Sequence, residues 1–190
     1  MNWVEIIAAA LGLIGIGLQI KQSHWYWLTS ILMVTLYIYV FYQSKFYADM
    51  SFQFYYLIVS IYGWYLWLTK SKKPDSETKY SVNRLNSKQL TISLLISSVL
   101  FVAIYFILKR FTDSPIPVGD AFTTALSISA TWLLAKKYLE NWLFWIVVDA
   151  ISTALYIVKG LYPTAILFIV LTVLAVVGYF KWRKEALQHA

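Results

Sequence analysis

Residues 140–159 read ENWLFWIVVDAISTALYIVK, a stretch long and apolar enough to cross a membrane that nevertheless carries an acid, Asp149, near its middle. About 20 mostly apolar residues span a bilayer as an α-helix, because lipid offers the backbone amides no other hydrogen-bond partner. A carboxylate in hydrocarbon costs roughly 2.5 to 3.5 kcal/mol on insertion scales, so such acids usually face a bundle interior or a wet cavity. We therefore expect Asp149 to point at whatever crosses the membrane.

The rest of the chain has the composition of an integral membrane protein. Of its 190 residues, 60% are apolar, 18% aromatic and only 13% charged, and the mean hydropathy is +0.63. These values lie far from those of soluble domains. A pass along the sequence predicts seven membrane-spanning helices: Trp3 to Ile20, Trp25 to Tyr42, Met50 to Leu68, Leu90 to Leu108, Val118 to Ala135, Trp142 to Val158 and Tyr162 to Phe180.

The net charge of +7 is distributed unevenly between the two sides of the membrane. The loops on the side of the N-terminus carry four basic residues, whereas the other side carries twelve, six of them in the polar linker 69–89. The positive-inside rule then places the N-terminus outside and the C-terminus inside. Basicity here indicates topology and argues against a nucleic-acid partner. The chain has no Cys and two isolated His residues, so no metal or cofactor is expected.

The first three and last three spans resemble one another. A shift of 115 residues aligns Gly63 with Gly178 and Trp67 with Trp182, and also four further positions: Glu5, Ala10-Leu11, Lys21 and Tyr47 with Asp120, Ala125-Leu126, Lys136 and Tyr162. In the second span the match Leu36-Tyr37-Ile38 with Leu155-Tyr156-Ile157 needs a shift of 119. We predict an all-α membrane protein of the three-plus-one-plus-three type, with parallel repeats as in some transporters. The single transport domain 1–190 then comprises a first bundle 1–68, a linker and connecting helix 69–110, and a second bundle 118–190.

Two spans carry a polar and aromatic stripe at helical spacing. Intervals of 4, 4, 3, 4 and 3 residues place one set on a single face: Asn141, Trp145, Asp149, Ser152, Tyr156 and Lys159. Intervals of 4, 3, 4, 4 and 3 do the same in the third span: Asp49, Gln53, Tyr56, Ser60, Trp64 and Trp67.

Several of these residues also have a purely structural interpretation. Asp49 and Asp120 sit at span ends and are equally well read as helix-start acids, and Ser60 and Ser152 as packing residues. Lys159 is expected to extend to the outer surface. The tryptophans at span ends are interpreted as interfacial anchors: Trp3, Trp25, Trp142 and Trp182.

The stripes resemble those of the PnuC-type vitamin transporters, a family that includes nicotinamide riboside carriers and related thiamine carriers. The resemblance rests on KFYADM with Gln53 and Tyr56, on SIYGWYLW from Ser60 to Trp67, and on ENWLFWIVVD followed by LYIVKGLY. It implies a protein of the cytoplasmic membrane, often trimeric, that lets an unphosphorylated vitamin precursor equilibrate across the bilayer. A separate cytoplasmic kinase then traps the substrate.

Such a carrier is expected to bind a cationic substrate on the two stripes. Nicotinamide riboside and thiamine both carry a positively charged heterocycle, which suits aromatic faces beside a carboxylate. The predicted substrate-binding residues are Tyr37, Gln53, Tyr56, Trp64, Asn141, Trp145, Asp149 and Tyr156. Nicotinamide riboside is the favoured substrate, with thiamine or riboflavin as alternatives. No G-x-x-x-x-G-K-[ST] sequence is present for ATP use, which fits facilitated diffusion, with proton coupling as the alternative.

Two other protein classes are less consistent with the sequence. A retinal photoreceptor needs a lysine in the last helix, and residues 162–180 contain none. An intramembrane aspartyl protease needs two converging aspartates. Asp120 and Asp149 are the candidates, but Pro117-Val118-Gly119 precedes Asp120 in place of a G-x-G-D sequence. We therefore do not expect an enzyme.

Overall fold

The computed structural model describes residues 3–43, 47–71, 81–160 and 162–188, and within these ranges it contains seven α-helices. The helices are α1 (Trp3–Ile20), α2 (Trp25–Gln43), α3 (Tyr47–Ser71), α4 (Ser87–Phe111), α5 (Pro117–Ala135), α6 (Asn141–Val158) and α7 (Tyr162–Gln188). The predicted all-helical fold is confirmed. The main difference is at the C-terminus, where α7 continues past Phe180, the predicted end of the span.

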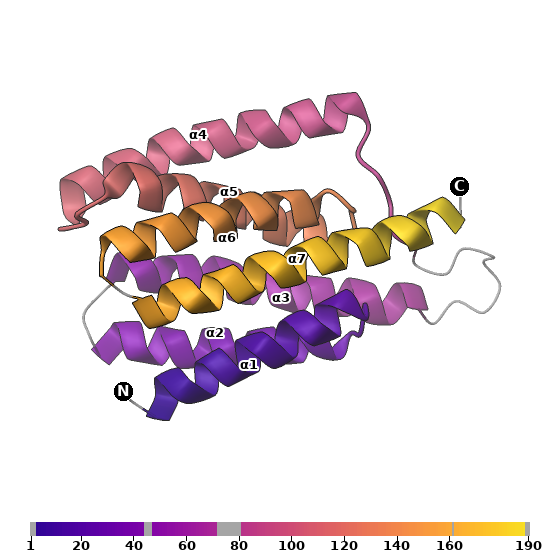
Figure 1. Ribbon diagram of the computed structural model, residues 1–190, viewed down its shortest axis with the longest axis horizontal. Helices are drawn as coiled ribbons and strands as arrows, with labels where there is room; N and C mark the ends of the chain where they lie inside the picture. The colour runs from indigo at the N-terminus through magenta and orange to yellow at the C-terminus, as the bar shows by residue number, and fades with distance from the viewer. Residues whose placement is uncertain (1–2, 44–46, 72–80, 161, 189–190) are drawn as a thin grey trace. The chain divides into compact units, whose positions relative to one another are not determined.

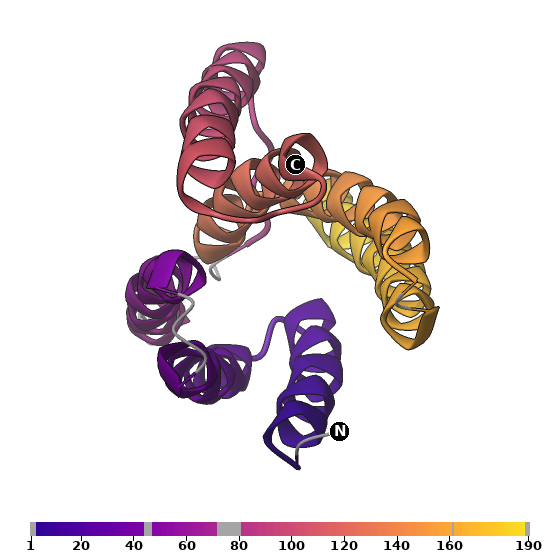
Figure 2. The ribbon, with the colours of Figure 1, turned by 90° about the vertical axis from the view of Figure 1, so that its left-hand side faces the viewer.

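The chain divides into two compact units, Met1–Ser81 and Val82–Ala190. In the first unit α2 packs against both α1 and α3. In the second unit α5 packs against α4 and α6, and α6 packs against α7 (Figures 1 and 2). Lys45, residues 72–80 of the predicted linker and the side chains of Trp3, Glu5 and Asp49 lie outside what the structure describes.

Four helices of the described chain are long and apolar enough to cross a bilayer: α4, α5, α6 and the Thr164–Leu187 part of α7. The first unit contributes shorter apolar helical segments at Ala10–Ile20 and Trp25–Val40. Large apolar side chains are exposed on the helices, for example Val99 of α4 at 69% and Ile166 of α7 at 63%. Hydrocarbon solvates such side chains, as expected of membrane-spanning helices.

The turn between α1 and α2 and the turn between α5 and α6 have the same backbone hydrogen bonds. Gln22 and Lys137 adopt positive φ of 55° and 54°, and each ends its helix in a Schellman motif, in which the N–H groups after the helix bond back to its last carbonyls. Five backbone N–H to O bonds recur at a shift of 115. In the first unit they run from Lys21 to Gly17, Gln22 to Gln19, Ser23 to Leu18, Tyr26 to Ser23 and Trp27 to His24. In the second unit they run, in the same order, from Lys136 to Trp132, Lys137 to Leu134, Tyr138 to Leu133, Asn141 to Tyr138 and Trp142 to Leu139. The internal repeat is thus a structural one.

Each repeat is also held by a pair of buried tryptophans packed on a glycine. Trp27 and Trp67 meet edge to face with ring centroids 5.5 Å apart, and Trp142 and Trp182 do so at the same distance. A Cβ on Gly63 would lie 2.4 Å from the Trp27 ring, and one on Gly178 would lie 2.6 Å from the Trp142 ring. Only a residue without a side chain lets the indole approach the helix this closely.

The tryptophan pairs correct two predictions. Trp142 and Trp182 are both 0% exposed, so they are packing residues and not interfacial anchors, whereas Trp25 is 54% exposed and fits an anchor. Trp27 occupies the place of Trp142 at a shift of 115. The shift of 119 predicted for the second span is therefore wrong, and one displacement relates all three helix pairs.

The segment before α4 docks on the α5–α6 turn. The Asn83 N–H donates to the Lys137 carbonyl at 2.9 Å, and the Leu139 N–H donates to the Asn83 carbonyl at 2.8 Å. Asn86 and Gln89 then form a reciprocal capping box that begins α4. Hence the last residues of the predicted linker are an ordered part of the second unit. They fix where α4 starts, and the buried hydrogen bond of 2.7 Å between Ser97 and Ser129 joins α4 to α5 further along.

We predict that Gly178→Ala lowers the free energy of unfolding by about 1 to 3 kcal/mol, because the new methyl group must displace the Trp142 ring. Gly17→Ala is the matched control, since a Cβ there meets nothing within 4 Å, and Ala in a helix interior is neutral or stabilising. Thermal unfolding of both variants in the same detergent, followed by tryptophan fluorescence, measures the difference. Equal melting temperatures would show that the glycine contact is not required.

Candidate substrate-binding site

The predicted polar stripe of the sixth span lies on one helix, α6, and most of it is buried within the second unit. Asn141 is 0% exposed, Asp149 5% and Ser152 6%, while Trp145 and Tyr156 are half-buried. Asp149 lies eight residues after Asn141, about 12 Å along the axis at 1.5 Å per residue. The structure therefore brings the five residues onto a single face that starts at the α5–α6 turn and reaches the middle of the helix and beyond.

Asp149 is the most unusual of these residues, because its carboxylate has no partner. Within the described chain no N–H or O–H group donates to its side-chain oxygens, and no basic side chain lies at salt-bridge distance. Its backbone carbonyl does accept from the Thr153 hydroxyl at 2.8 Å, which belongs to ordinary helix packing. A buried carboxylate without a hydrogen bond or a counter-ion is costly, and a cationic ligand would relieve that cost.

Two more polar groups on the same face are unsatisfied. The Asn141 side chain donates from Nδ2 to the Tyr138 carbonyl at 2.6 Å, but its Oδ1 has no partner among the described residues, and neither does the buried Nε1 of Trp145. Unpaired buried polar atoms are uncommon in folded proteins and call for an explanation. One acceptor, one donor and one carboxylate on three successive turns form a set of groups suited to a small polar cation.

The far end of the stripe is tied to α5 by an ion pair. Lys159 Nζ lies 2.7 Å from Asp120 Oδ1, and the Ser114 hydroxyl donates to Asp120 Oδ2 at 2.7 Å. Lys159 also sits 5.8 Å from the centre of the Tyr156 ring, which packs on Phe168 of α7 with centroids 5.0 Å apart. That Lys159 extends to the outer surface stays a prediction; its side chain is 21% exposed and is paired with Asp120 at the end of α5.

The pairing of Asp120 also bears on the aspartyl protease alternative. Asp120 is the acid of the first turn of α5, which begins with Pro117, and its two side-chain oxygens bond to Lys159 and Ser114. No hydrogen bond joins it to Asp149 among the described contacts. Two catalytic aspartates share a proton at short distance, and this pair does not have that arrangement.

The other four predicted site residues lie in the first unit. Tyr37 is on α2, and Gln53, Tyr56 and Trp64 are on α3; all four are half-buried. Trp64 Nε1 is buried and has no partner within the described ranges. Ser60 of the same stripe is 0% exposed and shares a hydrogen bond of 2.8 Å with Ser30 of α2, which supports its interpretation as a packing residue. That these four residues and the α6 face form one binding site remains a prediction.

Sequence reasoning missed two contributors to the geometry of the α6 face. Ser114 was not singled out, although it holds Asp120 in place for Lys159. Trp27 was not paired with Trp142, because the Leu-Tyr-Ile match displaced the alignment of the second span by one helical turn. The signal that could have found Trp27 was present, since tryptophan is rare and three tryptophan or glycine pairs share one shift.

Comparison with known proteins extends over nearly the whole chain. Residues 2–184 match the family model described as Nicotinamide mononucleotide transporter. The chain is 24% identical to the Nicotinamide riboside transporter PnuC of Escherichia coli (strain K12), covering 98% of this chain and 87% of that protein. It is 26% identical to the protein of the same name from Neisseria mucosa, covering 100% and 75%. The Riboflavin/roseoflavin transporter RibM of Streptomyces davaonensis is 24% identical over 95% and 84%.

The fold comparison agrees with the sequence comparison. A solved structure titled Crystal structure of the Vitamin B3 transporter PnuC superimposes with a TM-score of 0.77 and 25% identity, covering 99% of this chain and 83% of that one. The family predicted from the stripes is thereby confirmed. With a family model that matches almost every residue and a fold shared with a solved transporter, this chain belongs to the nicotinamide mononucleotide transporter family, whose members are multi-pass membrane transporters of small molecules.

Proposed function

We propose that this protein carries nicotinamide riboside across the cytoplasmic membrane by facilitated diffusion. The observation that carries the proposal is the unpaired, 5% exposed carboxylate of Asp149 on the same face of α6 as Trp145 and Tyr156. A pyridinium ring is a flat cation, so it can lie on an aromatic face while its charge interacts with the carboxylate. Side chains of the protein itself supply both the aromatic face and the carboxylate.

Two further unsatisfied atoms on the same face of α6 suit the ribose part of the same substrate. A ribose hydroxyl can donate to the free Oδ1 of Asn141 and accept from the free Nε1 of Trp145. The loss of a hydrogen bond to water on entry is then compensated inside the site. Tyr37, Gln53, Tyr56 and Trp64 of the first unit complete the site in this proposal, with Trp64 Nε1 as a further donor.

The names of the relatives help to rank the candidate substrates. Two of the relatives described above are named for nicotinamide riboside and one for riboflavin and roseoflavin, which supports nicotinamide riboside over thiamine. Riboflavin has no fixed positive charge, so it would leave the Asp149 carboxylate unpaired. The family also supports a bacterial inner membrane as the location.

Facilitated diffusion by itself only equalises the substrate concentration on the two sides, so net uptake requires that the substrate be consumed on the inside. We propose that a separate cytoplasmic kinase phosphorylates the imported riboside, because a phosphate ester carries negative charge and would meet the Asp149 carboxylate unfavourably. A trimeric assembly is proposed from the family resemblance alone. The sequence itself contains no phosphate-binding loop with which to use ATP.

The test of the site is the substitution Asp149→Asn, which keeps the size of the side chain and removes its charge. At an effective dielectric of about 20, an attraction over several ångströms is worth one to a few kcal/mol, so the affinity should fall tenfold or more. Asp113→Asn is the matched control, because Asp113 lies exposed in the α4–α5 loop. Calorimetry with nicotinamide riboside, thiamine and riboflavin on purified protein measures both variants. Unchanged affinity in a folded Asp149→Asn protein would remove Asp149 from the site, and wild-type preference for riboflavin would contradict the substrate.

The transport mechanism is tested in proteoliposomes that contain no kinase. Facilitated diffusion predicts that the internal concentration of radiolabelled nicotinamide riboside rises to the external value and stops there. An imposed proton gradient, or its collapse by a protonophore, should leave that plateau unchanged. Accumulation above the external concentration that disappears with the protonophore would establish proton coupling instead.

The orientation proposed from the four-to-twelve split of basic residues predicts the accessibility of the two ends. An epitope tag at the N-terminus should react with antibody on intact spheroplasts. A tag at the C-terminus, after Lys181, Arg183 and Lys184, should react only after permeabilisation. Both tags on one side would contradict an odd number of spans.

A further inference from the structure

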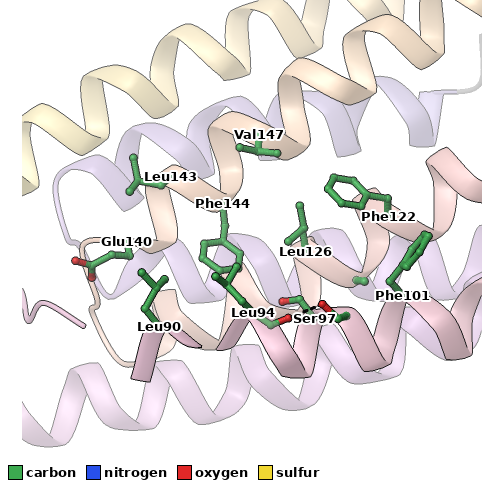
Figure 3. Close-up of a pocket in the computed structure, with 12 residues that line it drawn as sticks. Leu90, Leu94, Ser97, Phe101, Phe122, Leu126, Glu140, Leu143, Phe144 and Val147 are labelled. Carbon is green, nitrogen blue, oxygen red and sulfur yellow. Dashed lines mark hydrogen bonds between the residues drawn. The ribbon is translucent and has the colours of Figure 1, made fainter. Parts of the chain in front are cut away.

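A cavity of about 460 Å³ lies within the second unit, between α4, α5 and α6 (Figure 3), and Asp149 is not among the residues that line it. Its walls are formed by apolar side chains such as Leu94, Leu126 and Val147. At one end lie Phe101 and Phe122, which meet edge to face with centroids 6.1 Å apart. The other end lies at Glu140, where the α5–α6 turn begins α6.

The polar atoms in the cavity wall are already satisfied. The Ser97 hydroxyl bonds to Ser129 and to the Ser93 carbonyl, and the Ser98 hydroxyl donates to the Leu94 carbonyl at 2.9 Å. Glu140 accepts from the Leu85 N–H at 2.9 Å. A polar ligand would therefore find few partners inside the cavity, and the part of any ligand that lies there must be hydrocarbon.

The length of the cavity matches one leaflet of a bilayer. The lining residues of α4 run from Leu90 to Phe101 on successive turns, a span of eleven residues, or about 16 Å at 1.5 Å per residue. The hydrocarbon core of a bilayer is about 30 Å thick, so one leaflet contributes about half of that. The cavity lining therefore extends along α4 over a length comparable to that of an acyl chain in one leaflet.

The Glu140 end of the cavity lies beside a cation suited to a phosphate. Arg84 Nε lies 3.7 Å from Glu140 Oε1, and the Arg84 side chain is 64% exposed. Because guanidinium has five N–H donors, the contact with Glu140 leaves donors that face outward. Basic residues at a membrane surface attract anionic headgroups.

We propose that this cavity binds an anionic phospholipid, with one acyl chain between α4 and α6 and the phosphate on Arg84. The bound lipid fills the space between the connecting helix and the second three-helix set. It is a site separate from the one proposed for the substrate. Because no atom of Asp149 or Trp145 lines the cavity, the lipid site and the substrate site can fail independently.

The experiment is native mass spectrometry of the purified protein in mild detergent with added phosphatidylglycerol or phosphatidylcholine of identical acyl chains. We expect the wild type to retain one phosphatidylglycerol per chain at least fivefold better than phosphatidylcholine. Arg84→Gln should abolish that preference. Lys88→Gln removes the same charge at the same end, but Lys88 makes no contact with Glu140 among the described residues, so the preference should persist.

A second pair of variants tests the acyl-chain part of the site. Val147→Phe fills the cavity and should reduce retention of both lipids at least fivefold, whereas Val99→Phe, on an exposed face of α4, should not. As a measurement on unmodified protein, phosphatidylglycerol with a photoreactive group in its acyl chain should label peptides containing residues 90–101 and 143–147. Equal retention of the two lipids, or labelling confined to other helices, would overturn the proposal. A wild-type dimer that dissociates in Val147→Phe would also overturn the proposal, since a second copy of the chain would then occupy the cavity.

Discussion

The close approach of an indole ring to a bare stretch of helix backbone organises both halves of this protein. Trp142 lies against Gly178 and meets Trp182, and Trp27 lies in the same way against Gly63 and meets Trp67. Lipid gives little hydrophobic driving force for helix association, so helices in a membrane rely on close packing at small residues. The large flat ring fills the space that a glycine leaves, and it thereby sets the spacing of α2 from α3 and of α6 from α7.

The two repeats share this packing but differ in their polar chemistry. At a shift of 115, Asp149 occupies the position of Val34, and Trp145 that of Ser30. In the first unit Ser30 bonds to Ser60, so the contact between α2 and α3 is satisfied. In the second unit the position of Ser60 is taken by Ala175, which is 0% exposed, and Trp145 Nε1 is left without a partner in the described chain. The packing is thus the same in the two repeats, while the polar groups at these positions differ between them.

Much of this could be predicted from the sequence, and the failures have identifiable causes. The lengths of the apolar stretches predicted seven helices, and the 3.6-residue period placed Asn141, Trp145 and Asp149 on one face. Both predictions succeeded because these signals depend on local geometry alone. The burial of Trp142 could not be seen, since a tryptophan at a span end looks the same whether its ring faces lipid or a glycine on the next helix. Similarly, the ion pair of Lys159 depends on the start of α5, which is distant in sequence. The alignment of the second span with the sixth was wrong because it relied on a Leu-Tyr-Ile match, and these residues are common in any membrane helix.

The two ends of the α5–α6 pair have a mechanical consequence for a carrier that must open alternately to each side. At one end the Schellman turn at Lys137 joins the helices through backbone hydrogen bonds, and at the other the contact of Lys159 with Asp120 bridges them again. Because α5 and α6 are joined at both ends, they are expected to stay together and move as one rigid body. In the proposed transport function, this fastening predicts that the Asp149 face moves together with α5.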